Sequence, residues 1–436
     1  MPTQIISPTW IVPVVPRGTV LEGHSVVVRD DRILDILPTA EARASAPDAD
    51  EITLPEHVLT PGFVNTHGHA AMTLLRGYAD DRELMDWLNN HIWPVEGKLV
   101  NADFVYDGTS LAVAEMIAGG TTCGADSYFF PEATARAFAD FGFRGQVTLP
   151  VIQFPNAWAS TEAEHMEKGL ALHDSLRDSA LIHTAFAPHS PYTVTDDGFE
   201  KIVAHSESHD IAIHLHLHET ATEVDDAMAA ENRRPFARMQ SLGVVSNRLQ
   251  AVHMTQMTAG EIATMAEVGA HVAHCPESNM KLASGTCPVP ALLDAGVNVA
   301  IGTDGAASNN NLDMIEEARS ASLLAKVATG DATSLSAETL LEMMTLGGAR
   351  FLGLESKIGT IEKGKAADLT ATDLSPLRSQ PVHNPVSQLV YTASATQVTH
   401  TWIAGRLLYR DGTFKETDIE RVHATTRQWR DTISSL

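Results

Sequence analysis

Histidines and a carboxylate occur in this chain at spacings that suit a metal centre. The segment HLHLHE places His214, His216 and His218 at alternate positions, so all three share one face of an extended strand. His67 and His69 in NTHGH have the same spacing and can bind one ion side by side. Alternate histidines also occur in cores and on solvated edges. The pattern alone therefore leaves open which histidine of the stripe matters.

Two further polar residues follow other apolar segments. His253 lies in AVHM and Asp304 lies in AIGTDG, each at the end of a strand-like run. The candidate ligands thus come at the carboxyl ends of four different predicted strands. Neutral imidazoles and one carboxylate are ligands of zinc or ferrous iron, and a small ligand set with an open position is typical of catalysis. The sequence predicts a catalytic metal centre.

The strands that position these residues alternate with helical patterns such as AGEIATMAEVG, which ends in a helix-stopping glycine. Eight segments have the apolar, β-rich composition of strands: 57–67, 120–127, 143–152, 180–189, 211–219, 249–254, 270–276 and 297–305. This alternation favours an α/β fold with a (β/α)8 TIM barrel, whose closure brings the strand ends into one ring. A doubly wound sheet is the alternative.

The two ends of the chain have a different pattern, with short strand-like runs and frequent turn signals. Neither end is long enough to form a comfortable core alone. We expect residues 1–58 and 359–436 to pair into one small β-sandwich beside a barrel of residues 59–358, with a helix at the C-terminus.

The composition excludes some partners. The chain has 436 residues, 44% of them hydrophobic, and a net charge of −25, so it can bury a large core and repels phosphate backbones. Nucleic acid and anionic membranes are therefore poor partners. The three cysteines form no C-x-x-C pair, and no signal peptide or membrane span is evident. We expect a cytoplasmic protein.

Several motifs together resemble one family. They run in its order along the chain: PGFVNTHGHAAMTLLRGYADD, WPVE, FAPHSPY, IHLHLHET, VHM, SNMKLASG, GTDGAASNNNLDM and IGTIEKGKAADL. The chain resembles the amidohydrolase superfamily and, within it, the 5′-methylthioadenosine/S-adenosylhomocysteine deaminase family. The likeness covers nearly the whole chain, and H-x-H with GTDGAASNN is specific for this branch.

The resemblance implies one divalent metal ion, zinc before iron or manganese, held by His67, His69, His216 and Asp304. Binuclear members of the superfamily have a carboxylated lysine on the fourth strand. The fourth predicted strand here, ALIHTAFAPH, has no lysine. This difference favours a single ion.

The resemblance also implies the roles of the other residues. Glu219, three residues after the metal-binding histidine, would protonate N1 of a purine. His253 and Asp304 would take the proton of the attacking water, while Glu96 would hold the ribose hydroxyls and His189 would contact the nucleoside. The implied reaction removes the 6-amino group with water, yielding the inosine analogue and ammonia. Family members are commonly homo-oligomers.

The chain departs from members that accept S-adenosylhomocysteine, which have arginines after the third strand. Here GQVTLPVIQFPNAW contains none, and Leu149 stands at the nearest match. A carboxylate tail would lack its bidentate partner. We therefore expect 5′-methylthioadenosine as the substrate, with adenosine and S-adenosylhomocysteine as alternatives, and Leu149 at an apolar rim.

Two other functions are weighed against this one. An aminohydrolase acting on a guanine- or triazine-like ring would use the same centre, but such rings lack the ribose that Glu96 and His189 imply. A non-catalytic barrel scaffold is disfavoured by the intact set of candidate residues. The segment 70–99 is apolar enough to be a lid over the substrate or a helix packed on the barrel, and the sequence does not separate the two.

Overall fold

The computed structural model describes residues 3–415 and 417–436. Contacts divide the described residues into two compact units. The first unit comprises Met1–Asn65, Ala114–Cys123 and Asp313–Ile419, and the second comprises Thr66–Val113, Gly124–Leu312 and Glu420–Leu436. The predicted domain boundaries at residues 58 and 358 stay a prediction.

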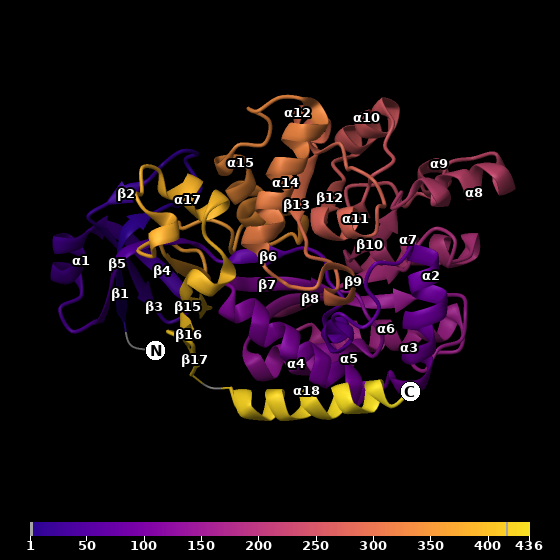
Figure 1. The fold of residues 1–436 in the computed structure, drawn as a ribbon, viewed down its shortest axis with the longest axis horizontal. Helices are drawn as coiled ribbons and strands as arrows, with labels where there is room; N and C mark the ends of the chain where they lie inside the picture. Colours follow the sequence, from indigo (N-terminus) through magenta and orange to yellow (C-terminus); the bar gives the residue numbers. More distant parts are fainter. Residues whose placement is uncertain (1–2, 416) are drawn as a thin grey trace. The chain divides into compact units, whose positions relative to one another are not determined.

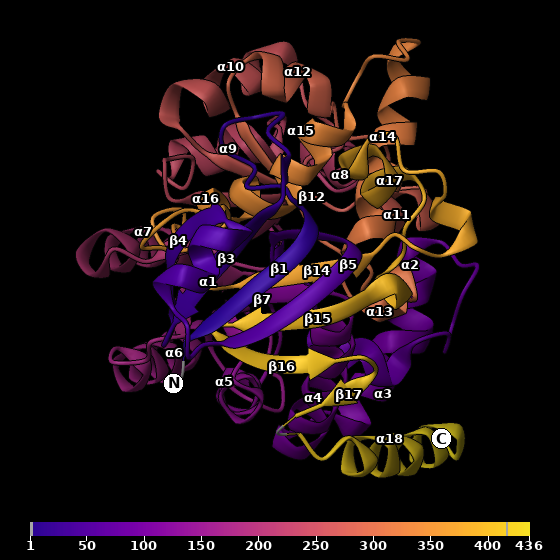
Figure 2. The same ribbon diagram turned by 90° about the vertical axis from the view of Figure 1, so that its left-hand side faces the viewer.

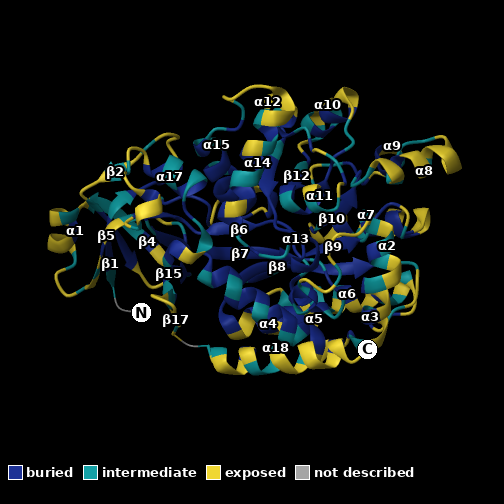
Figure 3. Ribbon diagram, viewed as in Figure 1, coloured by how far each residue is buried: buried dark blue, intermediate teal, exposed yellow. Residues whose placement is uncertain are grey.

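Eight strands form one sheet, and the pairs from β8 to β13 are parallel (Figure 1). In sheet order the strands are β6 (Phe63–Asn65), β7 (Thr121–Asp126), β8 (Arg144–Val151), β9 (Ile182–Pro188), β10 (Ala212–Leu217), β11 (Leu249–His253), β12 (His271–His274) and β13 (Asn298–Ile301). Each coincides with one of the eight predicted strands. The continuous burial of β8, drawn dark blue in Figure 3, and of β11 is expected of a sheet covered on both faces.

The chain just after the first strand meets the chain at the end of the last one. The amide of Thr66 donates to the carbonyl of Ile301 at 3.1 Å, and the amide of Asp304 donates to the carbonyl of His67 at 3.0 Å. The two ends of the strand order are thereby joined, which confirms the predicted (β/α)8 barrel.

Helices follow the strands, as the alternation predicts. They are α4 (Ala102–Ala118), α5 (Pro131–Phe141), α6 (Glu162–Leu176), α7 (Asp196–His209), α8 (Ala221–Glu231), α9 (Pro235–Ser241), α10 (Ala259–Val268), α11 (Pro276–Lys281), α12 (Val289–Asp294), α13 (Ala306–Asn309) and α14 (Met314–Thr329). The predicted helix stop is confirmed in α10. Thr258 and Glu261 form a capping box at its start, and Gly269 ends it at φ 73°.

The N- and C-terminal segments share one mixed sheet, whose strands lie side by side in Figure 2. Its order is β17 (Thr413–Phe414), β16 (Arg406–Arg410), β15 (Val398–Ile403), β14 (Leu369–Asp373), β5 (Asp50–Pro61), β1 (Gln4–Ile11), β3 (His24–Arg29) and β4 (Arg32–Pro38), with β2 (Leu21–Glu22) paired to β1. The antiparallel pairing of β14 with β5 joins the two ends of the chain. The predicted small β unit from both termini is confirmed, as one hydrogen-bonded sheet around Ile6, Leu59, Leu369 and Trp402.

The remaining helices are short, except for the last. The first unit also contains α1 (Thr39–Ser45), α15 (Ala337–Glu342), α16 (Gly348–Phe351) and α17 (Pro385–Tyr391). The predicted C-terminal helix is α18 (Ile419–Ser434), where Trp429 donates to Asp107 at 2.9 Å and packs edge-on against Phe104. Within the described residues, no helix has the length and apolar character that a membrane crossing requires.

Candidate metal centre and substrate pocket

Four side chains from three strand ends of the barrel point their ligand atoms at one spot. Oδ1 of Asp304 lies 3.3 Å from Nε2 of His67 and 3.3 Å from Nε2 of His69. Nε2 of His216 lies 3.2 Å from Nε2 of His67. Ligand bonds of 2.0–2.1 Å in a tetrahedron place neighbouring donor atoms about 3.3 Å apart. The four residues therefore have the donor types and spacings that fit a zinc-like cation.

The backbone makes this convergence possible by a close approach of two strand ends. A Cβ atom on Gly302, which follows β13, would lie 2.8 Å from the backbone nitrogen of His67. A glycine is therefore needed where the chain passes His67 on its way to Asp304. Asp304 itself has φ 61°, a left-handed conformation that aspartate tolerates better than most residues.

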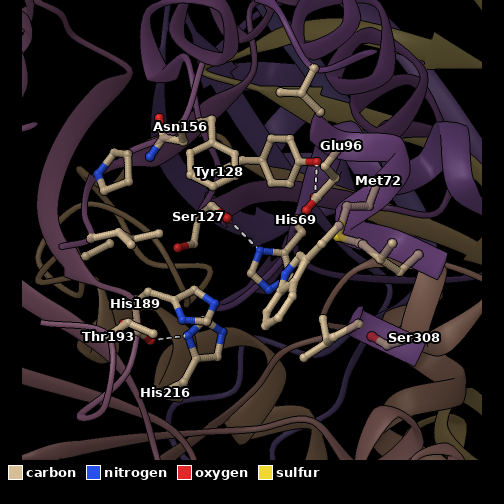
Figure 4. Close-up of a pocket in the computed structure, with 18 of the residues that line it drawn as sticks. His69, Met72, Glu96, Ser127, Tyr128, Asn156, His189, Thr193, His216 and Ser308 are labelled. Atoms are coloured by element: carbon tan, nitrogen blue, oxygen red, sulfur yellow. Dashed lines mark hydrogen bonds between the residues drawn. The ribbon is translucent and has the colours of Figure 1, made fainter. Parts of the chain in front are cut away.

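The opposite side of each candidate ligand is held by a hydrogen bond. Nδ1 of His69 donates to the carbonyl of Ser127 at 2.5 Å, and Nδ1 of His216 donates to the carbonyl of His189 at 2.7 Å (Figure 4). The hydroxyl of Ser278 donates to Oδ2 of Asp304 at 2.6 Å, which leaves Oδ1 facing the histidines. Such outer contacts fix the ring orientation and the tautomer of metal ligands.

Charges in this cluster are balanced between one carboxylate and one imidazole. Burial disfavours the ionised form of Asp304, but the neighbouring imidazoles of His67 and His69 hold its pKa well below the usual range. Burial lowers the pKa of His67 to about 4. Burial also opposes protonation of His69, but Asp304 and the Ser127 carbonyl outweigh it and raise the pKa of His69 to about 9.

His253 and Glu219 lie together at the edge of this cluster. Nε2 of His253 is 3.9 Å from Oε1 of Glu219, and its Nδ1 is 3.0 Å from Oδ1 of Asn279. Ligand atoms of His253, His67 and His216 also lie within 4.8 Å of one another. Burial raises the pKa of Glu219, which favours the protonated form that a general acid needs.

The cluster opens into a pocket of about 940 Å³. Apolar and aromatic side chains form most of the lining, among them Trp87, Ile92, Phe129, Ile152, Phe154 and Tyr192. Among the described residues that line it, none is a lysine or an arginine. The cavity has the volume of a drug-sized ligand site, with the metal-type cluster at one end.

Glu96 and His189 both line this pocket (Figure 4). Glu96 lies in α3 (Trp93–Leu99) and accepts a hydrogen bond from the hydroxyl of Tyr128. Burial raises the pKa of Glu96 to about 7. Burial lowers the pKa of His189, which directly follows β9, to about 4, so this imidazole is neutral at pH 7.

The other two histidines of the HLHLHE stripe are placed outside the set of converging ligand atoms. Nε2 of His214 lies 2.8 Å from Nδ1 of His67, behind the ring. Nε2 of His218 accepts from the amide of Phe236 at 3.1 Å. Of the three histidines, His216 thus lies at the metal-type cluster, His214 contacts His67 from behind, and His218 contacts the backbone of Phe236.

The prediction that Leu149 lies at an apolar rim of the substrate site is wrong. Its side chain is fully buried and faces outward, since a Cβ atom added to Gly169 of α6 would lie 3.1 Å from the Leu149 Cβ. Neighbours in a strand face opposite sides, and Pro150 and Ile152 line the pocket instead.

The segment 70–99 both packs and lines the cavity. It forms a 3₁₀ turn (Ala70–Leu75), α2 (Leu84–Trp87), a π-helical turn (Leu88–Ile92) and α3. Trp87 and Ile92 are buried in an apolar cluster and also line the pocket. The two alternatives left open by the sequence, a cover over the substrate and a helix packed on the barrel, therefore do not exclude each other.

Sequence reasoning missed several residues that support the site. Ser127 and Tyr128 follow β7, and Ser278 and Asn279 lie in α11, directly after β12. The available signal was a polar residue directly after a barrel strand. Only histidine and acidic residues at such positions were predicted as site residues. Ser278 and Asn279 stand within the SNMKLASG motif already noted.

An eight-stranded parallel barrel with histidines and an aspartate converging at its carboxyl ends defines a (β/α)8-barrel protein with a metal-type centre. A family model described as the Amidohydrolase family matches residues 58–408. The chain belongs to the amidohydrolase family.

Individual relatives agree with this assignment. The chain is 45% identical over 427 residues to a protein of Teredinibacter turnerae named 5-methylthioadenosine/S-adenosylhomocysteine deaminase, with 98% of this chain and 97% of the relative covered. It is 50% identical to the solved structure of an adenosine deaminase from Xanthomonas campestris with bound zinc, with a TM-score of 0.98 and 99% of each chain covered. A zinc complex of atrazine chlorohydrolase from Arthrobacter aurescens, 22% identical, has a TM-score of 0.91 over 98% of this chain and 100% of that one, and shows the fold alone.

Proposed function

We propose that this protein is a metal-dependent aminohydrolase that removes the 6-amino group of 5′-methylthioadenosine, yielding the inosine analogue and ammonia. The observation that supports it most is the convergence of His67, His69, His216 and Asp304 beside Glu219 in one largely apolar pocket. The names of the relatives at 45% and 50% identity point to the same chemistry.

His67, His69, His216 and Asp304 would hold one divalent cation, with zinc the first candidate and iron or manganese the alternatives. When bound, such an ion lowers the pKa of a coordinated water toward about 7 and so supplies a nucleophile at neutral pH.

The remaining residues move protons. Asp304 and His253 accept the proton of the attacking water. Glu219, whose pKa is raised by burial, donates to N1 of the purine, and this draws electrons from C6. The water oxygen bonds to C6, the proton taken from the water passes to the exocyclic nitrogen, and the C6–N bond breaks. Ammonia leaves, the purine retains the oxygen, and the remaining hydroxyl proton returns to Glu219.

Glu96 and His189 would position the nucleoside. The carboxylate of Glu96 can accept from two ribose hydroxyls, and Tyr128 holds it in place. Neutral His189 can donate or accept a single hydrogen bond. Positioning of this kind can lower the barrier by several kcal/mol, of the order of 7 kcal/mol in the best intramolecular cases.

The pocket lining favours a substrate without charge at the 5′ position. Lining side chains such as Trp93, Phe154 and Ile152 are apolar, and none of the described lining residues can pair with a carboxylate tail. A buried carboxylate without a cationic partner is costly. We therefore place 5′-methylthioadenosine before S-adenosylhomocysteine, with adenosine between them.

A deamination screen by ultraviolet absorbance tests this function with zinc-loaded protein and five substrates: adenosine, 5′-methylthioadenosine, S-adenosylhomocysteine, guanine and cytosine. We expect turnover of the 6-aminopurine nucleosides, fastest for 5′-methylthioadenosine. Turnover of guanine alone would replace this proposal with the free-base alternative.

A cytoplasmic location and a homo-oligomeric state belong to the same proposal. The three cysteines, all within the described residues, are buried and none is in a disulfide, which suits a reducing compartment. Light scattering on the purified protein tests the oligomeric state, and a monomeric mass would contradict the proposed homo-oligomer.

A further inference from the structure

His214 lies within a chain of buried side chains that leads to the candidate metal centre. Its Nε2 is 2.8 Å from Nδ1 of His67, and its Nδ1 is 3.2 Å from Oε1 of Gln250. The amides of Gln250 and Gln146 are joined by two hydrogen bonds, of 2.8 Å and 3.2 Å. Strands β8, β10 and β11 each contribute one residue, and all four side chains are buried.

The chain has one consistent direction of hydrogen-bond donation. Oε1 of Gln250 can only accept, so His214 has its proton on Nδ1. The other nitrogen of a neutral imidazole has a lone pair, so Nε2 of His214 accepts from Nδ1–H of His67. The lone pair of His67 then lies on Nε2, the atom that faces Asp304 and His216.

The burial of this chain makes its direction costly to reverse. A buried donor or acceptor that loses its partner destabilises the folded protein, and reversing one link would set two N–H groups against each other. The mutual amide pairing of Gln250 and Gln146 keeps the acceptor oxygen turned toward His214.

We propose that His214 is a positioning residue for the metal centre, which holds His67 in the tautomer and orientation that present Nε2 to the cation. Gln250 and Gln146 hold His214 in turn. The inference rests on the metal centre proposed above. The partner behind a metal-binding histidine is usually a carboxylate, a carbonyl or water. Here it is a neutral imidazole, which adds no negative charge to the centre.

The test is the zinc affinity of the metal-free protein, measured by competition with a chelator, together with the visible spectrum of the cobalt-substituted protein. Four proteins are compared: wild type, His214→Leu, His214→Gln and the control His218→Leu. His218 is a buried histidine at the same strand end, bonded to the amide of Phe236 and outside the chain that leads to His67. The control therefore reports the general cost of losing a buried imidazole.

Loss of the His214 acceptor should weaken zinc binding about 10- to 100-fold and change the cobalt spectrum. His214→Gln should restore most of the affinity, because its amide oxygen can accept from Nδ1–H of His67. His218→Leu should leave the zinc affinity unchanged. Wild-type affinity in a folded His214→Leu protein would overturn the inference.

Two further results also test the inference: a His214→Leu protein that does not fold, and a wild-type protein that binds no zinc. If His214→Leu does not fold, His214→Asn takes its place, because its shorter amide remains polar but does not reach His67. Weaker zinc binding by that variant supports the inference, and unchanged binding overturns it. If wild-type protein binds no zinc, the proposed metal centre and this inference are both wrong. If wild-type protein binds zinc and a folded His214→Leu protein binds it equally well, only this inference is wrong.

Discussion

The Nε2 atoms of His67 and His216 face each other at 3.2 Å, although the two residues are 149 positions apart in the sequence. His216 donates from Nδ1 to a backbone carbonyl, so its Nε2 has a lone pair. His67 is held in the same tautomer by His214. Two lone pairs so close repel each other unless a cation lies between them, and the pair is thus preorganised for a metal ion.

Zinc should therefore stabilise the metal-free protein. An ion present at 100 times its dissociation constant would add about 2.7 kcal/mol to the stability of the folded state. We expect calorimetry to show a rise of several degrees in the melting temperature on zinc addition. His216→Ala should abolish most of that rise, while Ala at the partly exposed His91 in the same unit should not. Equal rises in both variants would contradict the proposed ligand role.

Replacement of Glu219 by Gln should remove the proton donor without removing the metal centre. We expect the kcat for 5′-methylthioadenosine to fall by about 10²- to 10⁴-fold, with zinc content unchanged. Glu207→Gln, an exposed glutamate in α7, is the matched control and should retain full activity. A Glu219→Gln enzyme with near wild-type kcat would show that another group protonates the purine.

Glu96 should make nucleoside affinity depend on pH. Burial raises its pKa to about 7, so the carboxylate is ionised above this pH and protonated below it. Only the ionised form accepts from both ribose hydroxyls, so the KM for 5′-methylthioadenosine should rise as pH falls through about 7. Glu96→Gln should have a high KM with no such dependence. A wild-type KM that is flat from about pH 6 to about pH 8 would remove the ribose role.

A cation at the pocket rim should shift the substrate preference. Phe154 lines the pocket and is 57% exposed, so Phe154→Arg can be accommodated at the rim without burying a charge. We expect kcat/KM for S-adenosylhomocysteine to rise relative to 5′-methylthioadenosine, by about tenfold if one charge-assisted hydrogen bond forms. Phe154→Leu is the control for loss of the ring. No change in the ratio would place the 5′ group elsewhere in the pocket.

The strands and the converging residues were predictable because they depend on local sequence. Apolar runs followed by His67, His216, His253 or Asp304 identify strand ends, and barrel closure brings those ends together. Leu149 shows the limit: a one-residue error in the facing of a strand moves a side chain from the pocket to the helix layer.

The role of His214 was beyond the sequence for a related reason. Its position in HLHLHE predicts the same face as His216, but not its depth along the barrel or which ring nitrogen faces which partner. Tyr128 and Ser278 reach Glu96 and Asp304 from other strand ends, through contacts that no spacing within one segment reveals.

The most direct test of the whole account is ammonia release from 5′-methylthioadenosine by protein loaded with zinc. We predict one ammonia for each nucleoside converted to the 6-oxo product, and loss of the reaction when a chelator removes the ion. Zinc bound by wild-type protein, but with no ammonia from any 6-aminopurine nucleoside, would contradict it.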